Sequence, residues 1–405
     1  MRKWILGALL LLLAAGAAFW FSLDRDQRAV IANMPTDRDV LFWPVETRDA
    51  AFRALDAFPA LAGSNTIAAG GKTYPLPEGK PLDLGGFDLA GFEEQQRSAA
   101  IVVVLDGAIV LERYGLDFGP EGKWTSFSVA KSFTSTLVGA ALEDGAIDSL
   151  DDPITRYMPE LAGSGYDGVT IRQVLTMSSG TRWNEDYSDP QSDVAQFDKV
   201  DFPEGGDATV AYMKTLPREA EPGTRWQYNT GETNLIGVLV RRATGKGVAQ
   251  YLSEKVWKPF GMERDASWLL GRDGYEISGC CIQATTRDFA RFGLFALSGG
   301  VAGGKMAVPE GWFAEATEPR FETGGNRHGR GYAYQWWAYA DGAYAASGLF
   351  GQGIFIDPAR NLVIASNSNW LDANGAEQSA ARRNEFYAAV QAAVDARRRV
   401  GLPRR

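Results

Sequence analysis

Histidine and cysteine are almost missing from this sequence. Among its 405 residues there is one histidine, His328, and there are two cysteines, the neighbours Cys280 and Cys281. Two adjacent cysteines and a lone histidine do not have the spacing of the usual metal-binding motifs, so we predict no metal site. Because a disulfide between sequence neighbours is strained, we also expect no structural disulfide bridge.

Excess positive charge, low-complexity tracts and internal repeats are also lacking. The net charge is −9, which gives no electrostatic support to a nucleic-acid-binding surface. With 45% hydrophobic and 22% charged residues, the composition is that of an ordinary globular protein. The chain is long enough for one large domain or two subdomains.

A further absence concerns serine-hydrolase motifs. No serine lies in a G-x-S-x-G pattern, so the nucleophile turn of α/β-hydrolases is excluded. A Ser-His-Asp triad would have to use His328, which lies in the glycine-rich stretch 324–331, where a histidine is more often solvated. If the protein has a nucleophilic serine, its base should therefore be lysine or tyrosine.

The N-terminus carries the one long hydrophobic run. Arg2 and Lys3 precede an uncharged apolar stretch from Trp4 to Phe21, which is just long enough to span a bilayer. The preceding positive charges predict that the N-terminus stays in the cytoplasm and the body lies outside. We expect a retained signal anchor; cleavage near the small residues at 14–18 is the alternative.

The pattern of the remaining chain predicts an α+β fold. Two β-branched runs around Asp106-Gly107 predict a hairpin over 100–114. Helical patterns follow between about 145 and 297, and strands are expected at 332–339, 343–347, 353–356 and 362–366, before a closing helix over 376–398. Strands at both ends with helices between them indicate a sheet domain interrupted by a helical insertion.

A serine and a lysine lie one turn apart in the helix predicted over 128–143. Ser128 and Lys131 share a face at the first turn, where the helix N–H groups are unpaired and favour negative charge. An amine with a lowered pKa could accept the hydroxyl proton, which makes this an acyl-transfer arrangement. Alone, S-x-x-K is equally compatible with an exposed lysine on an ordinary amphipathic helix.

Several stretches in order make the resemblance to a known family clear. The segment 126–133 resembles the first motif of the serine β-lactamase and penicillin-recognising superfamily, in the branch with class C β-lactamases, esterases of that fold and 6-aminohexanoate-dimer hydrolase. Further similar stretches are Asp151 to Pro153, Val174 to Gly180, Trp226 to Gly231, Thr285 to Gly293 and Gly348 to Gln352.

The resemblance implies roles for individual residues. The segment 228–230 is similar to the family's Tyr-x-Asn motif, so Tyr228 would move the proton between Ser128 and the leaving group, helped by Lys131. Thr230 replaces the asparagine and is expected either to contact substrate or to cap the following helix.

The third family motif, Lys/His-x-Gly, aligns with 346–348, where Ala346 stands in place of the cation. This loss argues against efficient β-lactam hydrolysis, although Arg327 or Arg330 could substitute from a nearby loop. Gly348 fits a close approach of substrate, with the backbone N–H groups of Ser128 and Leu349 as oxyanion donors.

The stretch 183–190 resembles a loop that lines the substrate cleft in the 6-aminohexanoate-dimer hydrolase branch. By this resemblance Tyr187 is the candidate contact for the substrate, and packing under its neighbours is the alternative. We expect Glu185 and Asp186 to form a turn or to be solvated.

These observations predict an α+β, β-lactamase-like protein with an antiparallel sheet, flanking N- and C-terminal helices and an inserted helical subdomain. The expected parts are a membrane anchor or signal sequence at 1–23, a surface-hugging lead-in at 24–95, a sheet subdomain at 96–127 and 298–405, and a helical subdomain at 128–297. They together form one catalytic domain.

The function predicted from the same motifs is that of a serine hydrolase. It would cleave small or linear esters or amides through an acyl-enzyme on Ser128, without a cofactor. The alternatives are a β-lactamase or D,D-peptidase and, third, a membrane-tethered binding protein that has kept the fold.

Overall fold

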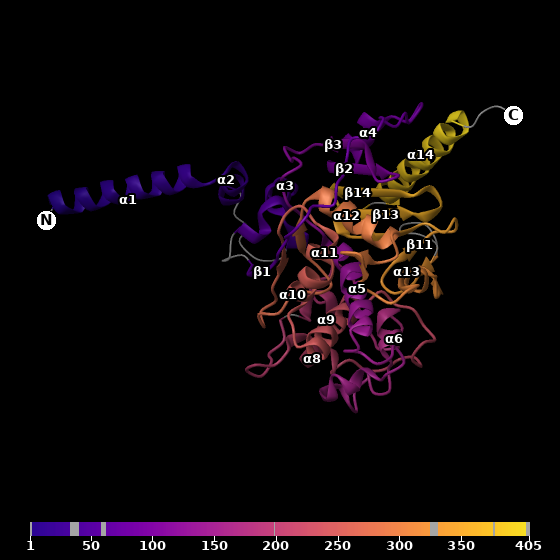
Figure 1. The fold of residues 1–405 in the computed structure, drawn as a ribbon. Helices are drawn as coiled ribbons and strands as arrows, with labels where there is room; N and C mark the ends of the chain where they lie inside the picture. Colours follow the sequence, from indigo (N-terminus) through magenta and orange to yellow (C-terminus); the bar gives the residue numbers. More distant parts are fainter. Residues whose placement is uncertain are drawn as a thin grey trace.

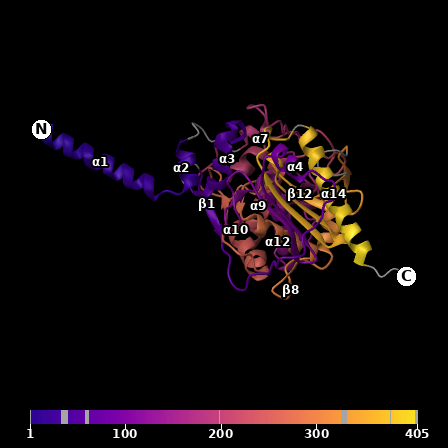
Figure 2. The same ribbon diagram turned by 90° about the horizontal axis from the view of Figure 1, so that it is seen from above.

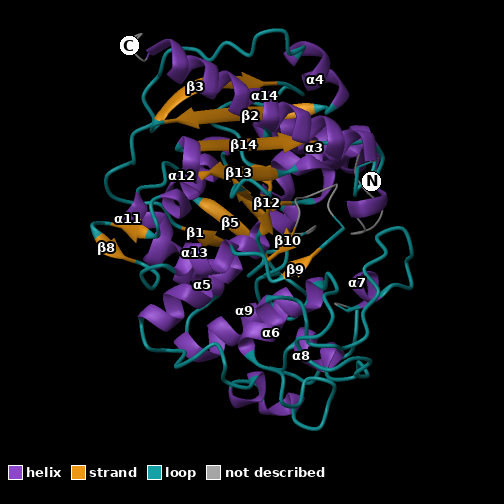
Figure 3. Cartoon of the chain, turned by 90° about the vertical axis from the view of Figure 1, so that its right-hand side faces the viewer, coloured by secondary structure: helices purple, strands orange, loops and turns teal. Residues whose placement is uncertain are grey.

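A large antiparallel sheet forms one half of the protein in the computed structural model, which describes residues 2–32, 40–57, 62–197, 199–324, 331–375 and 377–401. The strand order is β3-β2-β14-β13-β12-β11-β10-β9 (Figure 3). The strands are β2 (Ser98–Leu105), β3 (Ala108–Tyr114), β9 (Phe321–Glu322), β10 (Gly331–Tyr332), β11 (Trp337–Ala338), β12 (Tyr344–Ser347), β13 (Gly353–Asp357) and β14 (Leu362–Ser368).

Helices cover both faces of this sheet. They are α4 (Leu89–Gln95) and α14 (Glu377–Gly401) on one face and α12 (Thr286–Leu297) on the other (Figure 2). Side chains alternate along a strand, so Val102 and Val104 pack with the α12 side while Ile101 and Val103 pack with the α14 side. Because both faces are covered, every residue of β2 is buried, which explains its continuous apolar run.

A mostly helical half lies below the sheet (Figure 1). It contains α5 (Ala130–Glu143), α6 (Ile171–Leu175), α7 (Asp193–Gln196), α8 (Ala208–Met213), α9 (Thr230–Thr244), α10 (Val248–Leu252), α11 (Lys258–Phe260) and α13 (Trp312–Thr317). Helix α5 is buried along nearly its whole length and stands between α9 and the sheet. The two halves share one hydrophobic core.

A second, smaller sheet was not predicted. Its order is β1-β5-β6-β4, with β1 (Ser64–Ile67), β4 (Trp124–Thr125), β5 (Ala266–Leu269) and β6 (Ile282–Ala284). Its strands have only two to four residues, and β1 and β4 pair with strands that are distant in sequence. Such short, non-local pairings leave little periodic signal in the sequence.

The N-terminal segment departs from the body and then joins its core. Helix α1 (Arg2–Ser22) projects away from the rest of the protein in Figure 1 and is apolar and long enough to cross a membrane. After α2 (Arg25–Ala32), the helix α3 (Val45–Ala54) places Phe52 in the core with no exposed surface. The lead-in segment is therefore not confined to the surface, contrary to the expectation.

The predicted strand over 332–339 is also wrong. The structure has two short strands, β10 and β11, joined by a tight turn in which Gln335 has a φ of +61°. The hairpin at Asp106-Gly107 and the α+β class are confirmed. The stretch 332–339 contains no glycine or proline, the residues that usually indicate a turn, so the sequence did not predict this one.

Packing of α12 on the sheet gives a stability prediction at Gly293. Alanine there would gain about 1 kcal/mol of helix propensity, but its Cβ would lie 2.5 Å from Val363 Cγ1 and 3.0 Å from Ile354 Cγ2. Overpacking of this kind costs about 1–3 kcal/mol. We expect Gly293→Ala to lower the free energy of unfolding in urea, and Gly86→Ala, whose Cβ meets nothing within 4 Å, to leave it unchanged; a stabilised Gly293→Ala would contradict the packing.

Candidate active site

Ser128 lies on a short turn that links the small sheet to α5. Strand β4 ends at Thr125, and Ser126 is tied to β6 because its backbone N–H donates to the Ile282 carbonyl at 2.8 Å and its hydroxyl accepts from the Ile282 N–H at 2.9 Å. Ser128 then sits in a 3₁₀ turn, Phe127–Val129, that runs directly into α5. The first N–H groups of such a turn have no partner within it, so the Ser128 N–H is placed as an anion donor.

The residue before Ser128 is held in an unusual conformation. Phe127 has a φ of +42°, which costs a non-glycine residue about 1–3 kcal/mol. Its ring packs against Phe52 and Phe350 at centroid distances of 5.1 and 5.2 Å, and this packing offsets the cost. Phe52 comes from the lead-in segment, so that segment helps to fix the Ser128 turn.

Lys131 is buried one turn further along. Its side chain is 2% exposed, and its Nζ donates to the Gly279 carbonyl at 2.8 Å and to the Thr230 hydroxyl at 3.0 Å. Burial lowers the pKa of Lys131 to about 8, and the negative charge of Glu185 works against this shift. The alternative of an exposed surface lysine is therefore wrong.

Glu185 belongs to the group of side chains around Lys131 and Thr230. The sequence did not predict this position for it. Its carboxylate accepts hydrogen bonds from the Thr230 N–H at 2.9 Å, from the Thr230 hydroxyl, and from the side chains of Trp183 and Tyr187. The expected turn-forming or solvated role is thus wrong for Glu185, although Asp186 is exposed and accepts bonds from Ser188. In an extended segment, residues two apart share a side, so the spacing of 183, 185 and 187 could have indicated the grouping.

Thr230 connects Lys131 to Glu185. Its hydroxyl accepts from Lys131 and donates to Glu185, which forms a chain from amine to carboxylate. Thr230 is not the helix cap: the side chain of Asn229 caps α9 by accepting from the Glu232 N–H at 3.0 Å. The capping alternative for Thr230 is therefore wrong, and its hydroxyl is available to the site.

Tyr228 lies beside both Ser128 and Lys131. The Lys131 Nζ is 5.4 Å from its ring centroid, and the Ser128 side chain is near enough to affect the pKa of its phenol. The ring is stacked on Trp337 at 5.8 Å. Burial, followed by the charge of Glu185, raises the pKa of Tyr228 above its ordinary value, whereas the Ser128 side chain lowers it, so the neutral phenol is favoured.

Gly348 closes the site from the end of β12. A Cβ at this position would lie 2.5 Å from the Ser126 carbonyl and 3.1 Å from the Ser128 nitrogen, so only glycine fits against the turn. Leu349 follows at once and lines the same cavity as Ser128. The predicted oxyanion donors thus come from two segments that are in contact.

A cavity of about 400 Å³ opens beside Ser128. Of the predicted site residues, Ser128, Tyr187, Thr230 and Leu349 line this cavity. Lys131, Tyr228 and Gly348 lie next to these lining residues.

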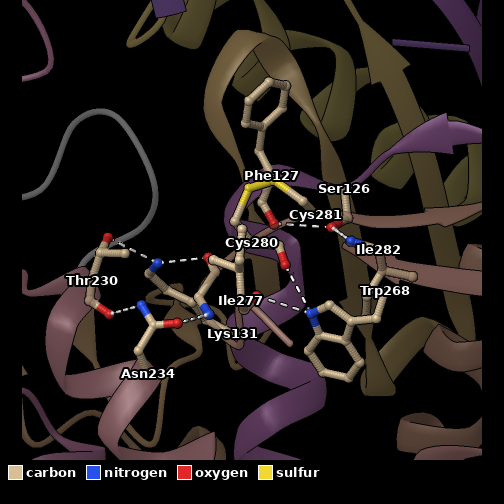
Figure 4. The surroundings of a disulfide bond; sticks show 11 residues. Ser126, Phe127, Lys131, Thr230, Asn234, Trp268, Ile277, Cys280, Cys281 and Ile282 are labelled. Carbon is tan, nitrogen blue, oxygen red and sulfur yellow. Dashed lines mark hydrogen bonds between the residues drawn. A yellow bond between two sulfur atoms is a disulfide. The ribbon is translucent and has the colours of Figure 1, made fainter. Parts of the chain in front are cut away.

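The two cysteines form a disulfide in the wall of this cavity. Cys280 and Cys281 are bonded to each other, which corrects the prediction of no bridge (Figure 4). The backbone adopts a φ of +78° at Cys281 in this small ring. Trp268 Nε1 donates to the Cys280 carbonyl at 2.9 Å, and the preceding residue is Gly279, the acceptor for Lys131.

The remaining candidates from the sequence are Ala346 and three residues of the stretch 324–331. Ala346 is buried in β12 and carries no charge. His328, Arg327 and Arg330 lie outside the described residues. Across the described ranges, no three His, Cys, Asp or Glu side chains are grouped so that they could hold a metal ion.

Comparison with known proteins assigns the fold and family. A family model described as beta-lactamase matches residues 65–389. The chain belongs to the beta-lactamase family. The recognition made from the motifs and the β-lactamase-like α+β fold are thereby confirmed.

Individual members of the beta-lactamase family are similar over much of the chain. The 6-aminohexanoate-dimer hydrolase of Paenarthrobacter ureafaciens is 32% identical over 303 residues, which are 70% of this chain and 76% of that protein. Esterase EstB of Burkholderia gladioli is 28% identical over 198 residues, which are 45% and 50% of the two chains.

A solved structure from Bacillus anthracis, provisionally described as a 6-aminohexanoate-dimer hydrolase, superposes with a TM-score of 0.72. It is 23% identical and covers 85% of this chain and 94% of its own. These beta-lactamase-fold relatives include amide- and ester-cleaving hydrolases, which is consistent with a serine hydrolase.

The Lys131–Thr230–Glu185 chain predicts a shift in pH dependence. If neutral Lys131 is required, the rate of Ser128 acylation rises with pH around a midpoint near 8. Because the charge of Glu185 raises the pKa of Lys131, Glu185→Gln should move this midpoint to lower pH. The measurement is the rate of fluorophosphonate labelling between pH 6 and 10.

Asp186→Asn is the matched control, since its exposed carboxylate contacts Ser188 and not Lys131. Its midpoint should stay at the wild-type value. An unchanged midpoint in Glu185→Gln would contradict an effect of the Glu185 charge on the pKa of Lys131.

The disulfide predicts a response to reductant. Opening the small ring after Gly279 frees the backbone that holds the Gly279 carbonyl on Lys131, so mild reduction should slow Ser128 labelling several-fold. Thiol titration should report two new thiols in the same sample. The double variant Cys280→Ser, Cys281→Ser should not respond to reductant, and a labelling rate that stays constant while two thiols appear would contradict the prediction.

Proposed function

We propose that this protein is a serine hydrolase that cleaves ester or amide bonds of small or linear substrates through an acyl-enzyme on Ser128. The observation that carries the proposal is the burial of Lys131 beside Ser128 and Tyr228, with its amine hydrogen-bonded to Gly279 and Thr230. A buried lysine with a pKa near 8 has about a tenth of its amine neutral at pH 7, which is enough for a base.

In the first step, neutral Lys131 takes the Ser128 proton, directly or through the Tyr228 phenol. A neutral amine has two N–H donors and one lone pair. Gly279 and Thr230 accept two N–H bonds, which leaves the lone pair for the incoming proton. Ser128 Oγ then attacks the substrate carbonyl carbon.

The developing oxyanion would be held by the N–H groups of Ser128 and Leu349, and each such donor is worth about 10²–10³ in rate. Because Tyr228 is favoured as a neutral phenol, it is suited to give its proton to the leaving alcohol or amine and to recover one from Lys131. Water then attacks the acyl-enzyme and gives a proton to the base, the bond between Ser128 Oγ and the acyl carbon breaks, and the base returns the proton to Ser128 Oγ as the acid product leaves.

A β-lactamase or D,D-peptidase activity is the second candidate. Relatives described as beta-lactamases support it, for example one of Pseudomonas fluorescens that is 26% identical over 161 residues. The uncharged Ala346 at the position of the family's third-motif cation speaks against it. Nitrocefin turnover together with stable penicillin labelling would favour this candidate over an esterase or amidase.

We also propose that α1 holds the catalytic body at the outer face of the cytoplasmic membrane. The support is an apolar helix, Trp4–Ser22, that follows Arg2 and Lys3 and has no buried residue. Cleavage of this helix as a signal peptide would give the same compartment.

The mechanism predicts which variants lose labelling. Ser128→Ala should abolish covalent modification by a fluorophosphonate probe, read by intact mass. Lys131→Met and Tyr228→Phe should retain Ser128 but lower kcat/KM for p-nitrophenyl acetate by about 10²–10⁴.

Ser132→Ala is the matched control, because this serine follows Lys131 in α5 and its hydroxyl donates to the Gln335 carbonyl at 2.7 Å. It should still be labelled. A wild-type protein that takes up no probe would contradict the enzymatic proposal. It would favour the alternative of a membrane-tethered binding protein.

A further inference from the structure

The cavity beside Ser128 is walled mainly by apolar side chains. Val40, Trp43 and Leu269 line it and belong to one hydrophobic cluster. Val194 and Val238 also line it. Its volume of about 400 Å³ falls in the range of small-molecule sites. The space is much larger than an acetyl group needs.

Within the described part of the chain, the charged side chains that line this cavity are Lys199, Asp207, Arg241, Arg272, Asp273 and Glu276. None of these described side chains is without an interaction partner. Asp207 accepts from Arg241 at 2.6 Å, and the Arg241 guanidinium stacks on the Tyr275 ring at 3.6 Å. Glu276 accepts from the Asn65 amide at 2.9 Å and from the Ala249 N–H at 3.2 Å.

The remaining carboxylate of the wall is paired in the same way. Asp273 accepts from the backbone N–H groups of Ala208 and Tyr275, both at 3.1 Å. Burial of a charged substrate group without a counter-charge costs several kcal/mol, so a substrate carboxylate or ammonium would be disfavoured in this hollow.

The segment that contains Val40 and Trp43 is continuous with the apolar helix α1. Seventeen residues, 23–39, separate Ser22 at the end of α1 from Val40. Residue Ala29 of α2 packs with the cluster that contains Trp43. The cavity is therefore lined in part by the stretch of chain that connects the body to a potential membrane helix. Figure 1 shows how α1, α2 and α3 follow one another along this stretch.

An acyl group stays bonded to Ser128 through both chemical steps, whereas the leaving group departs after the first. A space beside the nucleophile is therefore suited to the acyl side of the substrate. We propose that the hydrolase takes uncharged esters or amides with a linear apolar acyl chain, which lies in this cavity against the Val40–Trp43 segment. This proposal rests on the proposed serine-hydrolase function and names its substrate class.

The test is a chain-length series of p-nitrophenyl esters from acetate to decanoate, used below their micelle concentrations with the full-length protein. Burial of each methylene is worth up to about a fourfold gain in kcat/KM. We expect a rise of at least about tenfold from acetate to octanoate, and a lower kcat/KM for a matched acyl chain that ends in a carboxylate.

Ala195→Trp, which fills the cavity from α7, should remove the gain, so that the octanoate-to-acetate ratio falls toward one. Ala90→Trp is the matched control, because Ala90 is exposed on α4, away from the lining residues. It should keep the wild-type ratio.

The outcomes separate this proposal from the function on which it rests. If Ser128 is labelled by a fluorophosphonate but the wild-type ratio is one or less, the apolar-chain proposal is overturned and the hydrolase remains. If Ser128 takes up no probe, the hydrolase itself is overturned. Retention of the octanoate gain in Ala195→Trp would place the chain outside this cavity and also contradict the proposal.

Discussion

Keeping the Lys131 amine inside the protein is the constraint on which the other features of the site depend. Burial of an ammonium group costs free energy. This cost is offset because hydrogen-bond partners and a negative charge from separate segments surround the Lys131 amine. The Gly279 carbonyl comes from the loop before β6, the Thr230 hydroxyl from the start of α9, and the Glu185 charge from the loop before α7. Burial and charge act in opposite directions on the pKa of Lys131, and burial is the stronger.

The surrounding fold holds these three segments in place. Strand β4 and its bonds to β6 fix the Ser128 turn, and the Cys280–Cys281 disulfide follows Gly279 directly. Thr230, which belongs to the polar chain from Lys131 to Glu185, lines the cavity, as do Val40 and Trp43. In the proposed function, the polar chain serves proton transfer and the apolar residues bind the acyl chain, while Ser128 is common to both.

Local signals explain what could be predicted from the sequence. The hairpin at Asp106-Gly107 depends on a few adjacent residues, and it is confirmed. The Thr170 cap of α6 and the end of α9 at Gly245 are determined by local residues in the same way. The small sheet, the role of Glu185 and the disulfide depend on chain segments that are far apart or on backbone geometry. The spacing of 183, 185 and 187 indicates the local partners of Glu185, but its contact to Thr230 spans 45 residues and leaves no local signal.

The most direct test of the account is the pKa of Lys131 itself. Lysine side chains labelled with ¹³C and ¹⁵N can be titrated by NMR in the full chain, and the Lys131 signal is the one that Lys131→Arg removes. The account predicts that this signal titrates near 8, below the ordinary lysine value of about 10.4. A Lys131 signal that titrates with the surface lysines would contradict the lowering of its pKa by burial. It would also contradict the assignment of Lys131 as the base for Ser128.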